Sequence, residues 1–184
     1  VSPEALSVDG TWRNALHSGL LLTPIQSRPS VDLEAIIKVF LGVALAEQEA
    51  PSTKGFHVVF EPEPALWDGT HANNLWALEV PHPITKLVWD NAALISPATA
   101  KELGVKNGQM LRLSKGEAKV EIPAWIVPGH ADACATLSLG WGRSAAGRYG
   151  NGKGFDVNPL RTTAEMDVVS DVRVEAMTQT YNLV

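Results

Sequence analysis

The sequence contains one cysteine, Cys134. A single thiol excludes a disulfide within the chain, and it excludes a zinc ribbon or a four-cysteine iron–sulfur cluster built by this chain alone. The five histidines offer no local metal site either, because no two are spaced i, i+4 and there is no HxH or HExxH motif. We therefore expect no metal ligands in this chain, and no residue pattern singles out a catalytic group.

Long apolar runs and an excess of positive charge are also missing. The apolar segment "AIIKVFLGVALA" contains a lysine and falls short of the ~20 residues that a membrane-spanning helix needs. Lys and Arg number 15 against 20 Asp and Glu, so the net charge of −5 argues against a nucleic-acid partner, since phosphate binding requires a basic face. Hydrophobic residues make up 45% of the chain, which is enough for a packed core.

The sequence begins at Val1 and shows no signal peptide, lipidation motif or basic targeting segment. We expect it to be a piece of a longer protein, referred to below as the parent subunit. A processed mature protein is the second interpretation. In the first case, any cofactor is shared with sequence outside this chain.

The first 54 residues are predicted to be a helical N-terminal segment. Residues 9–19 have the pattern of a short helix, and apolar residues recur at helical spacing after Ser30 or Asp32, either of which can cap a second helix that Pro51 ends. Residues 20–29 are a connector with two prolines. We place the domain boundary near Gly55, which gives residues 1–54 as an appendage and 55–184 as the domain.

Residues 55–184 are predicted to be mainly β with helices. Strand-like patterns cover residues 56–62, 85–91, 110–114, 118–127, 134–142 and 172–178. One helix is strongly marked, with Ser96 as N-cap, Pro97 in the first turn and Gly104 after the last turn. Many short strands with one clear helix are typical of a small barrel or sandwich.

A glycine-rich stretch, "LSLGWGRSAAGRYGNGKGFDVNPLRTT", runs over residues 137–163. Glycines let backbone N–H groups approach an anion, and Arg143, Arg148, Lys153 and Arg161 can pair with a pyrophosphate. The alternative is a loop that is solvated or that packs against the rest of the parent. No GxGxxG or Walker lysine is present, so neither a Rossmann turn nor a P-loop is supported.

Other polar residues have both a local and a functional interpretation. In "HANNLW", Asn73 and Asn74 can bind a base edge and Trp76 can stack on a ring, or the asparagines make a turn and the tryptophan lies in the core. Asp90 and Asn91 are expected to satisfy their own turn. Glu61 and Glu63, interleaved with prolines, are expected at a rim or linker.

Several segments carry a family resemblance. The block "ISPATAKELGVKNGQMLRL", a later "GWG" and the closing "DVNPL" resemble the C-terminal domain of the molybdopterin oxidoreductase family, over roughly residues 70–165. That domain contacts the pterin dinucleotide in members that carry the cofactor. Within the family, "GRYGNGKGFDVNPLRT" and "FEPEPALWDGTHANN" are similar to the large iron–sulfur and molybdopterin-like subunit of bacterial alternative complex III.

The resemblance implies a fold, a double-psi β-barrel of about six strands. It also implies a cofactor-binding wall, with molybdopterin guanine dinucleotide as the cofactor of the parent and iron–sulfur clusters in its preceding part. With the residue chemistry above, the predicted cofactor-binding residues are Asn74, Trp76, Gly140, Trp141, Gly142, Arg143 and Asn158.

The subgroup implies an alternative, because its molybdopterin-like region is thought to lack the pterin. The domain is then a structural module of a quinol-oxidising respiratory complex. In either case the expected partners are the remainder of the parent and other subunits of a membrane-bound complex, on the periplasmic face of the bacterial inner membrane. A third interpretation, a stand-alone barrel that binds proteins or acts as a self-processing decarboxylase, lacks the expected cleavage serine.

Overall fold

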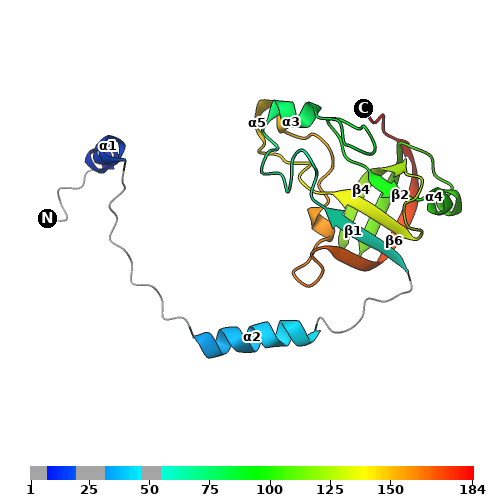
Figure 1. The fold of residues 1–184 in the computed structure, drawn as a ribbon, viewed down its shortest axis with the longest axis horizontal. Coiled ribbons are helices and arrows are strands. Elements are labelled where there is room, and N and C mark those ends of the chain that lie inside the picture. The colour runs from blue at the N-terminus through cyan, green and yellow to red at the C-terminus, as the bar shows by residue number, and fades with distance from the viewer. Residues whose placement is uncertain (1–7, 20–31, 47–54) are drawn as a thin grey trace. The chain divides into compact units, whose positions relative to one another are not determined.

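The computed structural model describes residues 8–19, 32–46 and 55–184 (Figure 1). The chain divides into two units, residues 1–44 and 45–184. Each is described by itself below. The predicted connector at residues 20–29 lies outside the described residues, and the boundary near Gly55 stays a prediction.

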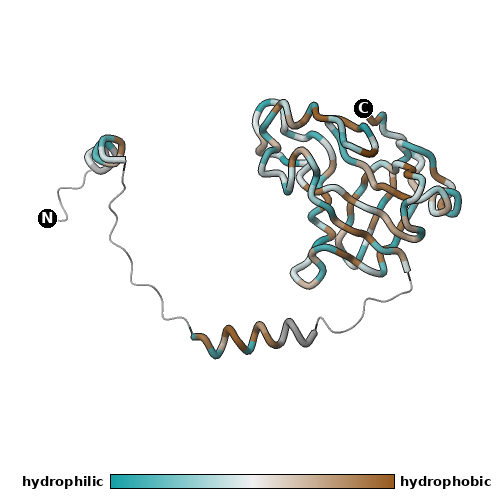
Figure 2. Tube along the Cα trace, in the orientation of Figure 1, coloured by the Kyte–Doolittle hydropathy of each residue, from teal (hydrophilic) through white to brown (hydrophobic). Residues whose placement is uncertain are grey.

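The N-terminal unit contains the first predicted helix and most of the second. Helix α1 (Val8–Ser18) ends at Gly19, whose φ of 69° lies in the left-handed region. Helix α2 (Leu33–Ala46) begins after Asp32, whose carboxylate accepts the backbone N–H groups of Glu34 at 3.0 Å and Ala35 at 3.2 Å. Both helix predictions are confirmed. In α2, Figure 2 shows mostly hydrophobic residues interrupted by hydrophilic ones, and the large hydrophobic residues whose side chains are described are exposed.

The second unit contains a closed barrel of six strands, in the order β1-β5-β2-β4-β3-β6. The strands are β1 (Phe56–Glu61), β2 (Ala93–Ile95), β3 (Gln109–Lys115), β4 (Ala118–Ile126), β5 (Cys134–Ser138) and β6 (Val168–Thr180). Two pairs are parallel, β1 with β5 and β2 with β4, and the other four are antiparallel. The prediction of a mainly β fold with helices and a six-stranded barrel is confirmed.

The barrel interior is filled by every second residue of each strand, because side chains alternate between the two faces of a sheet. On β1, Val58 and Phe60 are buried while Glu61 is exposed. The core of the barrel includes Val58, Phe60, Ala93, Ile95, Leu111, Leu113, Val120, Ile122, Ala124, Ala135, Leu137 and Val169. Closure of the sheet therefore encloses one hydrophobic core and leaves the site candidates to the connecting segments.

Helix α4 (Pro97–Leu103) forms where the sequence predicts it. The Ser96 hydroxyl accepts the backbone N–H of Thr99 at 3.0 Å, and Gly104 ends the helix with a φ of 69°. The Ser96 hydroxyl also donates to Asp132 in the connection between β4 and β5. Ser96 is thus a helix cap, as its context indicates.

The predicted strand over residues 85–91 is wrong. Lys86 and Trp89 both have a φ of 64°, which breaks the extended backbone that a strand requires. The Trp89 N–H instead donates to the Leu78 carbonyl at 3.1 Å, so this segment folds back on the one before it. Short helices that the sequence did not indicate are α3 (Leu75–Glu79), α5 (Gly147–Gly150) and the 3-10 helix η2 (Asn158–Leu160).

Candidate functional site

The glycine-rich segment follows β5 and lies against the segment that precedes α3, and α3 and α5 contact each other (Figure 1). The turn at Gly140–Trp141–Gly142 has left-handed glycines at both ends, with φ values of 94° and 73°. The Gly142 N–H donates to the Lys153 carbonyl at 2.7 Å, so the loop closes on itself at its base. This hydrogen bond brings the start of the loop to its end.

At several glycines of this loop, the space that a side chain would need is filled by the protein's own backbone. A Cβ on Gly140 would lie 2.8 Å from the Gly69 nitrogen, and one on Gly142 would lie 2.1 Å from the Asp156 nitrogen. At Gly150 it would lie 2.2 Å from the Ala72 carbonyl oxygen. These glycines therefore allow close packing between chain segments. Gly152 differs, since nothing lies within 4 Å of its Cβ position.

Trp141 is a buried anchor of the turn. Its side chain is 6% exposed and packs with Leu66 and Leu78, and its indole N–H donates to the Glu63 carboxylate at 3.2 Å. Glu63 is 4% exposed, so the prediction of a rim or linker position is wrong for it. A buried carboxylate requires a hydrogen-bond donor, and the indole supplies one. Trp141 thus fixes the turn from inside and offers no ring face to a ligand.

Asn91 was missed as a site residue. Its side chain is 3% exposed, and it bonds outside its own turn: Nδ2 donates to the Ser138 carbonyl at 3.1 Å and to the Phe155 carbonyl at 3.0 Å. Its Oδ1 accepts the Phe155 N–H at 2.7 Å. The expectation that Asn91 satisfies its own turn is wrong, because the amide joins the end of β5 to the far side of the glycine loop.

Asp90 is held by the C-terminal tail. The Tyr181 hydroxyl donates to the Asp90 carboxylate at 3.1 Å, and the Tyr181 ring meets Phe155 edge-on at a centroid distance of 5.1 Å. Burial raises the pKa of Asp90, and the bond from Tyr181 opposes that rise. Burial and the charge of Asp90 together raise the pKa of Tyr181.

A small cavity lies beside the carboxylates of Glu63 and Asp90. Its volume is about 10 Å³, which is room for about one water molecule. Its lining residues are Glu63, His82, Thr85, Leu87, Asp90, Asn91, Ala92, Leu94 and Ser138. None of the predicted cofactor-binding residues lines it, so it is a space behind the turn and not a binding pocket for a nucleotide.

Arg143 and Asn158 are the exposed polar residues at the two ends of the loop. An Arg143 Nη2 group donates to the Asp68 carbonyl at 2.8 Å, which ties the turn to the segment before α3. Asn158 donates through its backbone N and Nδ2 to Asp156, at 3.0 and 2.8 Å, and accepts from Arg161 at 3.2 Å. Both side chains have protein partners, and both remain accessible from solvent.

Asn74 and Trp76 lie on the neighbouring helix α3. Asn74 is its N-cap, since its Oδ1 accepts the Trp76 N–H at 3.1 Å. Trp76 is 79% exposed, so the interpretation of a core tryptophan is wrong and its ring is free to stack. The structure thus brings the predicted residues onto two adjoining segments, and it divides them into buried supports and exposed groups.

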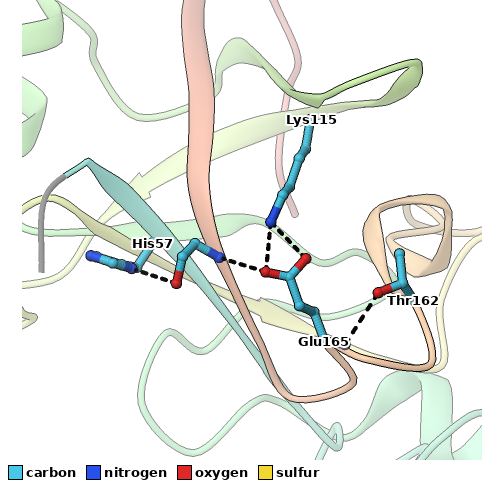
Figure 3. A network of polar contacts seen from close by, with 5 residues as sticks. His57, Lys115, Thr162 and Glu165 are labelled. Atoms are coloured by element: carbon cyan, nitrogen blue, oxygen red, sulfur yellow. Dashed lines mark hydrogen bonds and ion pairs between the residues drawn. The ribbon is translucent and has the colours of Figure 1, made fainter. Parts of the chain in front are cut away.

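A second polar cluster joins β1, β3 and β6 (Figure 3). His57 Nδ1 lies 3.2 Å from the Ser170 hydroxyl, and Lys115 pairs with Glu165 at 2.6 Å. Glu165 also accepts the Ser170 N–H at 3.5 Å. The cluster therefore ties the connection before β6 to the barrel wall.

A surface groove of about 490 Å³ lies over β3, β4 and β6. Its cations are largely paired: Arg112 with Glu121 at 2.7 Å, and Arg173 with Glu175 at 2.8 Å. Lys115 is paired with Glu165 as described above. Most of the positive charge that lines the groove is therefore compensated.

In the part of the chain that the structure describes, no group of three or more His, Cys, Asp or Glu side chains is placed to hold a metal ion. No helix in the same residues combines the length and hydropathy needed to cross a bilayer. Cys134 is half-buried, and burial raises the pKa of its thiol, which lowers its reactivity.

One comparison with curated proteins finds a partial match to a molybdopterin-containing subunit. No protein-family model matches the chain. A stretch of 65 residues, 35% of the chain, is 31% identical to the thiosulfate reductase molybdopterin-containing subunit PhsA of Salmonella typhimurium, of which it covers 9%. Acetylene hydratase from Pelobacter acetylenicus matches 73% of the chain and 16% of its own length, at 12% identity and a TM-score of 0.39. The match to PhsA supports the resemblance to molybdopterin oxidoreductases.

Proposed function

We propose that this chain is the barrel domain of a molybdopterin oxidoreductase-like subunit and forms one wall of its pterin dinucleotide site. One observation carries the proposal: the two segments that resemble the family's dinucleotide site, residues 140–142 and 156–158, lie against each other. The Gly142 Cβ position is 2.1 Å from the Asp156 nitrogen. The similarity to a molybdopterin-containing subunit supports it independently.

The residues fit a dinucleotide along the exposed side of this wall. Arg143 keeps donors beyond the one that binds Asp68, and guanidinium groups bind phosphates well. Asn158 is exposed, and the Trp76 ring can stack on a heterocycle. Trp141 and Gly140 would support the wall from behind. When bound, the cofactor would supply two-electron chemistry at molybdenum, and this domain would only bind and orient it.

The alternative function is a structural module in a respiratory quinol-oxidising complex that has lost the cofactor. Two further glycines favour it, since a side chain at Gly140 or Gly150 would meet the protein's own backbone. The hydrogen bond from Arg143 to the Asp68 carbonyl also uses part of a phosphate-binding side chain. In this case, exposed Trp76 would contact another part of the parent or another subunit.

Both functions place the chain in a larger assembly. The matched stretch spans 9% of the length of PhsA. With one cysteine this chain cannot build a four-cysteine cluster, so iron–sulfur clusters of the parent would lie in sequence outside it. The remainder of the parent is the proposed first partner. Association with a membrane-bound respiratory complex on the periplasmic face, as in alternative complex III, belongs to the same proposal.

Cofactor content of the purified parent subunit separates the two functions. The dinucleotide wall predicts molybdenum and a pterin in the parent, with guanine nucleotide released on acid hydrolysis. It also predicts that Asn158→Ala lowers the nucleotide content, while Asn182→Ala, at an exposed asparagine of the C-terminal tail, leaves it unchanged. A parent without molybdenum, pterin and nucleotide would contradict the dinucleotide wall and support the structural module.

A further inference from the structure

The amide of Asn91 connects the two segments that form the proposed wall. We propose that Asn91 is the positioning residue of that wall, which rests on the function proposed above. Nδ2 donates to the Ser138 carbonyl at 3.1 Å, on the strand end that leads into Gly140. The same side chain holds Phe155, directly before Asp156, through both of its backbone polar groups, at 3.0 and 2.7 Å.

This arrangement sets the separation of the segments because each hydrogen bond has a restricted length and direction. The amide uses both N–H donors and its carbonyl oxygen in these hydrogen bonds, and only 3% of the Asn91 surface is exposed. A Cβ on Gly154 would lie 2.9 Å from Asn91 Oδ1, so the loop approaches the amide closely. Few side chains can replace an amide here, since the site needs two donors and one acceptor within one planar group.

Phe155 links the buried Asn91 amide to the exposed residues Asp156 and Asn158. Its backbone is held by Asn91 and its ring meets Tyr181, whose hydroxyl donates to Asp90. Asp156 follows directly, and its carboxylate accepts hydrogen bonds from the backbone N–H and from Nδ2 of Asn158. Loss of the Asn91 amide therefore frees Phe155 first, and Asn158 loses its fixed place relative to Gly142 and Arg143.

The test compares variants of the full parent subunit, freed of bound nucleotide, in equilibrium dialysis with GMP. Asn91→Leu removes all three hydrogen bonds, and Asn91→Asp keeps an acceptor for the Phe155 N–H but no neutral amide donors. Ile122→Val is the control, because it weakens the buried barrel core and leaves the three hydrogen bonds of Asn91 in place. Hydrogen exchange of the Phe155 amide is followed in the same samples, below the unfolding temperature of each variant.

The expected result is a loss of GMP affinity of about tenfold or more for Asn91→Leu and for Asn91→Asp, since the aspartate would turn a buried carboxylate oxygen toward the Ser138 and Phe155 carbonyls, and no change for Ile122→Val. Phe155 should exchange faster in both Asn91 variants and normally in the control. If wild-type parent fails to bind GMP, the proposed function is overturned and the positioning role with it. If the wild type binds and the Asn91 variants bind equally well, only the positioning role is overturned. Asn91→Asp, which is isosteric, decides the question if the leucine variant does not fold.

Discussion

The indole N–H of Trp141 donates to the carboxylate of Glu63 at 3.2 Å, and both side chains are buried. The two residues are far apart in sequence, and the sequence predicts different roles for them: cofactor binding for Trp141 and a rim or linker position for Glu63. In the folded barrel they form one support under the Gly140–Gly142 turn. The strength of that support can be measured separately from any ligand.

Replacing Glu63 with leucine should destabilise the folded chain. The indole N–H of Trp141 would then be buried without an acceptor, which costs about 1–3 kcal/mol. Glu63→Gln keeps an acceptor oxygen and should lose less than about 1 kcal/mol. Urea unfolding of the two variants beside the wild type checks this. Equal stability of Glu63→Leu and wild type would show that the hydrogen bond adds nothing.

The tight glycine position is predicted to be Gly142 rather than Gly152. Both have left-handed φ values, 73° and 67°, so alanine at either should cost about 1–2 kcal/mol of backbone strain. Only at Gly142 does the new Cβ meet a backbone atom, the Asp156 nitrogen at 2.1 Å. Overpacking should add about 1–3 kcal/mol there. Urea unfolding should therefore rank Gly142→Ala clearly below Gly152→Ala, and the reverse order would contradict the packed loop.

The stability of the fold should depend on pH through Asp90. Its pKa is raised above the ordinary value of 3.8 in the folded state, so the folded state holds its proton more tightly than the unfolded state does. The associated stability is present below pH 3.8 and is lost as the pH rises through the folded pKa. Asp90→Asn cannot ionise and can still accept from Tyr181.

The measurement is the difference in unfolding free energy between Asp90→Asn and wild type across this pH range. As the pH rises above 3.8, the wild type should lose stability relative to Asp90→Asn, and the difference should become constant once the pH exceeds the folded-state pKa of Asp90. Comparing two chains cancels the other titrating groups. A difference that moves in favour of the wild type would show that the bond from Tyr181, and not burial, dominates the pKa of Asp90.

Part of the fold can be predicted from local signals in the sequence. Ser96, Pro97 and Gly104 give the helix α4 correctly, because a cap, a first-turn proline and a C-terminal glycine act within a few residues of chain. The strand pattern gives a mainly β fold that is either a barrel or a sandwich, since alternation marks the face that must be buried, and only the family resemblance selects the six-stranded barrel that the structure shows. These signals are local, and the structure follows them.

The support of the site could not be predicted in this way. Glu63 and Asn91 are polar residues in segments rich in turn formers, and only the return of a distant segment buries them. The left-handed backbone at Lys86 and Trp89 has the same origin, because Trp89 pairs with Leu78 and not with a strand. The role of the glycines could not be predicted either. A glycine that lies against a ligand and one that packs against the chain's own backbone cannot be distinguished in the sequence.

Trp76 is predicted to matter for binding and not for folding. Its side chain is 79% exposed, so Trp76→Ala should change the unfolding free energy by no more than about 0.5 kcal/mol, as is usual for surface substitutions. Trp141→Ala provides the contrast, because a buried tryptophan truncated to alanine costs about 3–5 kcal/mol. In the parent subunit, the dinucleotide wall predicts that Trp76→Ala weakens GMP binding through loss of ring stacking. If the domain is instead a structural module, Trp76→Ala should fold normally, and neither the wild-type parent nor the Trp76→Ala parent should bind GMP. The Trp76→Ala barrel should then associate more weakly with the remainder of the parent. Unchanged GMP affinity in a parent that binds GMP would remove Trp76 from the wall.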